Sequence, residues 1–196
     1  IEDIDRMGVN PRFQAMYAVE DEKAGWKKGQ WHTAVPPQAR PSTGLTPVDY
    51  FGRKMVDNLP DSIKVGTITV VVGGASIDLF DKRTYKAYLT KQPDWMKNFA
   101  SPSNGNPYAR LIDLAKIAKK QGVIKGILLH QGETNNGDAN WPNRVKTVYN
   151  DILKDLNLKA EDVPLLVGET VQKDMGGKCW AHIAIVDDIA KTIPTA

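Results

Sequence analysis

Hydrophobic residues occur along the chain in two kinds of pattern, and the order of these patterns predicts the fold class. Runs rich in apolar or β-branched residues, typical of buried strands, occur at 13–19, 65–72, 123–130 and 164–168. Apolar residues with helical spacing follow them at 46–58, 107–120, 143–156 and 179–191. This strict alternation predicts one domain over residues 1–196 with an α/β fold, a three-layer α/β/α sandwich around a parallel sheet.

One segment departs from the alternation. Residues 20–45 are rich in Trp, Pro and Gly and predict a long loop, which in a compact domain usually either lines a site or is disordered. Its tryptophans, Trp26 and Trp31, favour an ordered loop. Either ring could stack against a ligand, although anchoring the loop is the more common role of a loop tryptophan.

Polar and glycine-rich turns follow three of the predicted strands. Gly73 and Gly74 follow the strand at 65–72, the segment 131–138 follows the strand at 123–130, and Glu169 follows the strand at 164–168. Because the carboxyl ends of parallel strands meet at one edge of a sheet, these turns are expected to be neighbours.

The first two turns carry the candidate chemistry. A backbone N–H at Gly74 could stabilise an oxyanion, although the glycines could also serve a turn that needs positive φ. Glu133 stands between Gln131 and Asn135, a grouping suited to holding a histidine or a substrate hydroxyl, whereas a lone glutamate near a turn is more often a cap or a solvated acid.

Histidine and serine positions give weaker signals. His32, His130 and His182 show no metal-ligand spacing, so no metal site is expected. His130 is expected to be buried and hydrogen-bonded, and His182 to have a packing role. Ser76 follows Gly74 and is expected to cap a short helix rather than act as a nucleophile.

Composition narrows the classes of partner. A net charge of +3 with dispersed basic residues disfavours nucleic-acid binding, and no apolar run approaches the roughly 20 residues needed to cross a membrane. Nucleotide-binding glycine motifs are absent from the sequence, so no cofactor is expected. Cys179 is the single cysteine, and no export signal is visible in the first residues.

The stretches VGTITVVVGGASIDLF and GILLHQGETNNGD resemble the carbohydrate esterase family six acetyl xylan esterases, relatives of the sialate O-acetylesterases in the SGNH hydrolase superfamily. The resemblance extends over essentially all 196 residues. It implies a flavodoxin-like sheet and a serine-type esterase that removes O-acetyl groups from acetylated sugars, with acetyl xylan as the expected substrate, through an acyl-enzyme. It also implies a secreted or periplasmic protein.

The resemblance assigns roles to six residues. Gly74 would donate an N–H to the oxyanion, Gln131 would support the loop or contact that oxygen, and Glu133 would orient the catalytic histidine. Expected substrate contacts are Gly73, Asn135 and Trp31.

The sequence also departs from the family pattern. It has no G-Q-S-N serine block and no D-x-x-H histidine block, and the strand that would carry the serine is expected between those at 13–19 and 65–72. We expect segments outside residues 1–196 to supply both blocks. The alternatives are an inactive carbohydrate-binding module of the same fold, and an unrelated hydrolase that uses Ser76 with His130.

Overall fold

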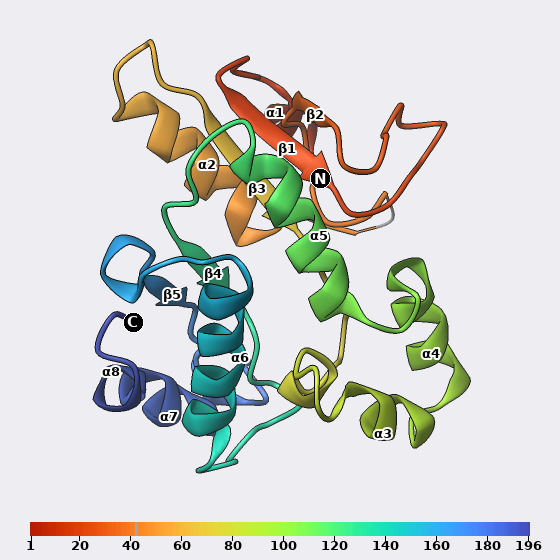
Figure 1. The fold of residues 1–196 in the computed structure, drawn as a ribbon, viewed down its shortest axis with the longest axis vertical. Coiled ribbons are helices and arrows are strands. Elements are labelled where there is room, and N and C mark those ends of the chain that lie inside the picture. Colours follow the sequence, from red (N-terminus) through yellow and green to blue (C-terminus); the bar gives the residue numbers. More distant parts are fainter. Residues whose placement is uncertain (42) are drawn as a thin grey trace. The chain divides into compact units, whose positions relative to one another are not determined.

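The computed structural model describes residues 1–41 and 43–196, which fold into two compact units, Ile1–Val71 and Val72–Ala196 (Figure 1). Both units combine helices with a small sheet, which confirms a mixed α/β fold. The expectation of a single domain with added serine and histidine blocks stays a prediction. Within the described residues, no helix is long and apolar enough to cross a membrane.

The first unit is built on a three-stranded sheet with the order β2-β1-β3. Its elements are α1 (Asp3–Arg6), β1 (Phe13–Tyr17), β2 (Trp31–Thr33), α2 (Pro47–Asp57) and β3 (Val65–Thr69). Helix α2 begins as expected after Thr46, whose N–H donates to Asp49 Oδ2 at 2.7 Å, with Pro47 in the first turn. Gly52 on α2 permits close packing on β1, because a Cβ there would lie 2.0 Å from the Phe13 ring.

The pairing of these strands corrects the expected sheet. Strand β1 pairs directly with β3 in parallel, from Phe13 opposite Val65 to Tyr17 opposite Thr69, so no gap separates them. Five residues on each strand are paired in register, and α2 provides the crossover between the strands. The sheet is also not wholly parallel, because β2 runs antiparallel to β1.

Trp26 anchors the long loop that precedes β2. Its ring stacks on Tyr17 with centroids 3.8 Å apart and planes 6° apart, and it lies in the apolar core with Phe13, Ala15 and Val56. The anchoring role expected of a loop tryptophan is therefore observed for Trp26, which is not available to a ligand. Burial raises the pKa of Tyr17 to about 12.

The second unit is mostly helical. Its longer elements are α3 (Tyr85–Thr90), α4 (Asp94–Ala100), α5 (Pro107–Lys119), β4 (Ile127–Leu129), α6 (Trp141–Asp155) and β5 (Leu165–Val167). Short helical turns are η1 (Ile77–Leu79), η2 (Ser101–Ser103), η3 (Ala160–Asp162), η4 (Trp180–His182), α7 (Ile183–Asp187) and α8 (Ile189–Thr192). An apolar cluster of Val72, Ala75, Leu79, Met96 and Ala100 packs the segment after Gly74 against α4.

Strands β4 and β5 form a separate two-stranded parallel sheet. The prediction that the run at 123–129 is a buried strand is wrong, because Val123 is 82% exposed and lies outside the strand. Leu128 pairs with Leu166, and both side chains are more than 40% exposed, so one face of this sheet is uncovered in the described chain. A single three-layer sandwich is therefore not confirmed.

Candidate functional site

Two turns of the second unit lie side by side, and we call them the glycine turn (73–76) and the acid turn (131–138). The Thr134 hydroxyl donates to the Gly74 carbonyl oxygen at 2.9 Å, and the Gln131 side-chain nitrogen donates to the Ala75 carbonyl oxygen at 3.3 Å. The predicted proximity of these two strand-end turns is thus confirmed.

Gly74 has the geometry of an exposed N–H donor. Its φ of +74° lies in the left-handed region that favours glycine, and the residue is exposed to solvent. Among the described residues, no hydrogen bond engages its N–H. Gly74 can therefore serve both of the roles considered for it. The turn requires its positive φ, and its N–H can face a developing negative charge.

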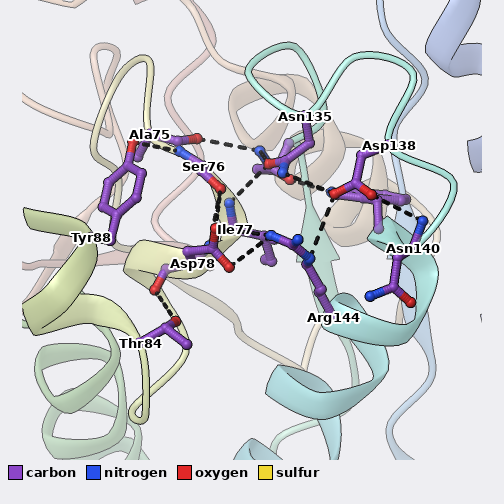
Figure 2. A network of polar contacts seen from close by, with 12 residues as sticks. Ala75, Ser76, Ile77, Asp78, Thr84, Tyr88, Asn135, Asp138, Asn140 and Arg144 are labelled. Atoms are coloured by element: carbon purple, nitrogen blue, oxygen red, sulfur yellow. Dashed lines mark hydrogen bonds and ion pairs between the residues drawn. The ribbon is translucent and has the colours of Figure 1, made fainter. Parts of the chain in front are cut away.

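Gln131 and Asn135 hold the two turns together. The Asn135 side-chain oxygen accepts from the Ile77 N–H at 3.0 Å and from the Gln131 side-chain nitrogen at 2.8 Å (Figure 2). The Gln131 oxygen in turn accepts from the indole nitrogen of Trp141, which is fully buried. Asn135 is itself buried, so its side chain positions the glycine turn, and its expected contact with substrate stays a prediction.

An ion-pair network that was not predicted from the sequence crosses the same junction. Figure 2 shows Arg144 on α6 between Asp78, which follows the glycine turn, and Asp138 at the end of the acid turn. Its guanidinium donates to both Asp78 oxygens at 2.9 Å and lies 3.5 Å from Asp138. No spacing rule could connect Asp78 with Arg144, because these two residues are 66 positions apart in the chain and meet through the fold alone.

Ser76 has the capping role that was expected. It is the N-cap of η1, its hydroxyl accepts from the Asp78 N–H at 3.2 Å, and it also lies 3.1 Å from an Asp78 carboxylate oxygen. Its own N–H donates to the Tyr88 hydroxyl. His130 instead contacts Glu133, so within the described residues the structure does not join Ser76 to His130 as a nucleophile and base.

Glu133 is accessible at the surface of the acid turn. Its side chain is 50% exposed, and one carboxylate oxygen lies 3.3 Å from His130 Nε2. His130 is exposed as well, which corrects the expectation that it is buried. The reason is that β4 ends at Leu129, so His130 already belongs to the turn that leaves the sheet. The Glu133 carboxylate therefore keeps an open side toward solvent that could receive another donor.

His182 lies beneath the acid turn, fully buried. Its ring meets Trp141 edge-on at 4.7 Å, and a Cβ added to Gly132 would lie 2.4 Å from its Cδ2. Neither ring nitrogen has a hydrogen-bond partner among the described residues. Burial lowers the pKa of the imidazole, and the carboxylates of Asp138 and Glu133 act in the opposite direction. The packing role expected for His182 is observed, but its burial under the site was not foreseeable from a lone histidine.

The remaining candidates lie at different places. Gly73 is exposed in the glycine turn, whereas Trp31 belongs to the first unit, where its ring covers Gly66. Glu169 follows β5 and accepts from the Gln172 side chain at 2.6 Å. Gly168 directly follows β5, and its N–H donates to the carbonyl oxygen of Leu129, the last residue of β4, at 2.9 Å. The ends of β4 and β5 are therefore hydrogen-bonded to each other. Roles of Gly73 and Trp31 in binding substrate stay predictions.

The chain is similar in fold to a solved plant protein and matches a family model over most of its length. A crystal structure of a protein from Arabidopsis thaliana aligns with a TM-score of 0.59 at 18% sequence identity, over 92% of this chain and 64% of that one. This likeness concerns the fold, and the chain spans less than two thirds of the plant protein. The family model described as carbohydrate esterase, sialic acid-specific acetylesterase, matches residues 14–195. The chain therefore belongs to this family of carbohydrate esterases.

Proposed function

We propose that this chain forms the oxyanion and acid portions of a serine-type esterase that removes O-acetyl groups from acetylated sugars, with acetyl xylan as the expected substrate. The observation that carries the proposal is the hydrogen bond from Thr134 to Gly74, which holds the candidate oxyanion donor beside the turn that bears Glu133. Membership of a carbohydrate esterase family supports the reaction class and does not favour a binding module without chemistry.

Each turn has a separate task in the proposed reaction. When a serine oxygen attacks the acetyl carbon, the carbonyl oxygen gains negative charge, and the exposed Gly74 N–H stabilises it. Removal of one such donor typically costs about 100- to 1000-fold in kcat. Gln131 keeps the glycine turn in place through its bond to Ala75, and Glu133 accepts the N–H of the histidine that acts as base.

The serine and the histidine are proposed to come from flanking segments, since the sequence contains neither family block. The exposed side of the Glu133 carboxylate supports this proposal, because a histidine from a flanking segment could donate a hydrogen bond to it. Loss of the nucleophile or the base of a triad costs on the order of a million-fold in turnover, so residues 1–196 alone should be nearly inert.

The test compares two lengths of polypeptide on three substrates. Residues 1–196 and the natural polypeptide with its flanking segments are assayed on acetylated xylan, O-acetylated sialic acid and p-nitrophenyl acetate. We expect release of acetate from the longer form, with the highest kcat/KM on acetylated xylan. Turnover of no ester by the longer form would refute the esterase, and a preference for O-acetylated sialic acid would refute the xylan assignment alone.

A further inference from the structure

An exposed tryptophan adjoins the glycine turn and has no role in the site described so far. Trp95 is the second residue of α4, and its side chain is 51% exposed. A Cβ built on Gly74 would lie 3.3 Å from Trp95 Cη2 and 3.6 Å from Cζ3, so the six-membered part of the indole lies directly against that glycine. The candidate oxyanion donor and the ring are therefore in van der Waals proximity.

The helix that carries Trp95 is fixed to the same apolar cluster as the glycine turn. Met96 and Ala100 are buried in the cluster that also contains Val72 and Ala75, on either side of Gly74 in the chain. Because successive helical residues point in different directions, burial of Met96 leaves Trp95 on the outer side of α4. The anchored helix thus places the indole beside Gly74, although the ring is open to solvent.

A second aromatic ring extends this surface. Phe99 lies one helical turn after Trp95, with the ring centroids 5.7 Å apart and the planes at 78°, and it is 41% exposed. The two rings are therefore in edge-to-face contact. Exposed apolar groups of this kind cost free energy in water, and a contiguous set beside a site usually marks a surface that binds a ligand.

We infer that Trp95, with Phe99 at its edge, is the platform on which the sugar ring of the acetylated substrate lies while its ester occupies the Gly74 turn. The inference rests on the proposed function. The C–H face of a pyranose is apolar and flat enough to cover an indole, whereas the sugar hydroxyls stay at the rim in water. When the acetyl ester lies at Gly74, only the ester bond separates it from the sugar ring, so that ring lies next to the indole. We therefore assign this surface to a carbohydrate and not to a protein partner.

The kinetic test uses substrates with and without a sugar. Trp95→Leu and Trp95→Phe are made in the polypeptide with its flanking segments, and hydrolysis of acetylated xylo-oligosaccharides is compared with that of ethyl acetate. We expect Trp95→Leu to raise KM for the sugar ester about fivefold to tenfold and to lower kcat/KM for ethyl acetate by a much smaller factor, because ethyl acetate has no sugar ring to lie on the indole. Trp95→Phe should recover most of the loss, because it restores an aromatic face.

A binding measurement keeps the inference testable if the protein hydrolyses no ester. Titration of residues 1–196 with acetylated xylo-oligosaccharides should change tryptophan emission in the wild type and in Trp180→Phe, a control at another exposed tryptophan, but not in Trp95→Phe. Equal effects of Trp95→Leu on both substrates, no effect on either, or an emission change that survives in Trp95→Phe would each overturn the platform. Absence of any esterase activity would refute the proposed function separately.

Discussion

The guanidinium of Arg144 donates to both carboxylate oxygens of Asp78 at 2.9 Å and so ties helix α6 to the segment that follows Gly74. The same side chain lies 3.5 Å from Asp138, at the far end of the acid turn. One cation therefore neutralises two acids, Asp78 just after the glycine turn and Asp138 in the acid turn. Because both acids are partly shielded from water, this contact should contribute more than an exposed ion pair does.

Replacement of Arg144 by Met keeps the apolar stem and removes the charge. We expect the free energy of unfolding to fall by about 1–2 kcal/mol, because Asp78 and Asp138 lose their shared partner and repel each other. Urea denaturation at neutral pH measures this. Lys159→Met is the matched control, since its pair with Glu161 spans 3.9 Å with both side chains about three-quarters exposed. Equal losses in the two variants would contradict the special role of Arg144.

Thr134→Val tests whether the hydrogen bond to Gly74 positions the oxyanion donor. Valine has nearly the shape of threonine but cannot donate to the Gly74 carbonyl oxygen. We expect kcat on acetylated sugars to fall about tenfold with little change in KM, because a misplaced donor weakens transition-state binding more than substrate binding. The control is Thr147→Val, which removes a similar bond within α6, from the Thr147 hydroxyl to the Asn143 carbonyl oxygen. A loss confined to stability would argue against positioning.

Glu133→Gln keeps the size of the side chain and removes its negative charge. If Glu133 orients the catalytic histidine, kcat should fall by on the order of 1,000- to 10,000-fold, as when the acid of a triad becomes an amide. Steady-state kinetics of the polypeptide with its flanking segments gives the measurement. Glu161→Gln, at an exposed acid on η3, should leave kcat unchanged. Activity within threefold of wild type in Glu133→Gln would remove this residue from the mechanism.

Local signals in the sequence correctly predicted several of the helices. Proline in the first turn correctly placed the starts of α2 and α5, and the helix expected at 143–156 is observed as Trp141–Asp155. Capping and periodicity depend on neighbours within a few residues, so they can be read without knowledge of the fold. The meeting of the glycine and acid turns was also expected, although the reason given for it was wrong, because β3 and β4 belong to different sheets and do not end at one shared edge.

Relationships between distant segments were not predictable in the same way. A β-branched run indicates a strand but not its neighbour, so the direct pairing of β1 with β3 was missed, as was β2 within the loop. Helices α3 and α4 were not predicted at all, and with them the position of Trp95 beside Gly74. The ion pair between Arg144 and Asp78 was likewise not predictable, because no local pattern in the sequence connects the two residues.

Gly132→Ala tests the close approach between the acid turn and His182. A methyl group there would lie 2.4 Å from His182 Cδ2, and φ is +149°, which alanine rarely adopts. Gly137→Ala is the matched control, because Gly137 also has positive φ but no atom within 4 Å of an added Cβ. We expect Gly132→Ala to destabilise the protein by about 1–3 kcal/mol more than Gly137→Ala, measured by thermal unfolding. Similar losses would mean that backbone strain alone matters.

Burial of His182 makes a specific contribution to the pH dependence of stability. Its pKa in the folded protein lies below the unfolded value of about 6.5, so the unfolded chain binds more protons as the pH falls below 6.5. Acidification from there toward the folded pKa therefore destabilises the protein, whereas above pH 6.5 the effect is absent. His182→Phe removes the titrating group and retains a ring against Trp141.

The difference in unfolding free energy between wild type and His182→Phe should thus be constant above pH 7 and shift in favour of the variant as the pH falls through 6 to 5. Carboxylates elsewhere titrate in both proteins and cancel in this difference. Urea denaturation at half-unit pH intervals provides the curve. A difference that stays flat from pH 8 to pH 5 would show that His182 takes up its proton as readily in the folded protein as in the unfolded chain. Its full burial argues against this, because neither ring nitrogen has a hydrogen-bond partner in the described part of the chain.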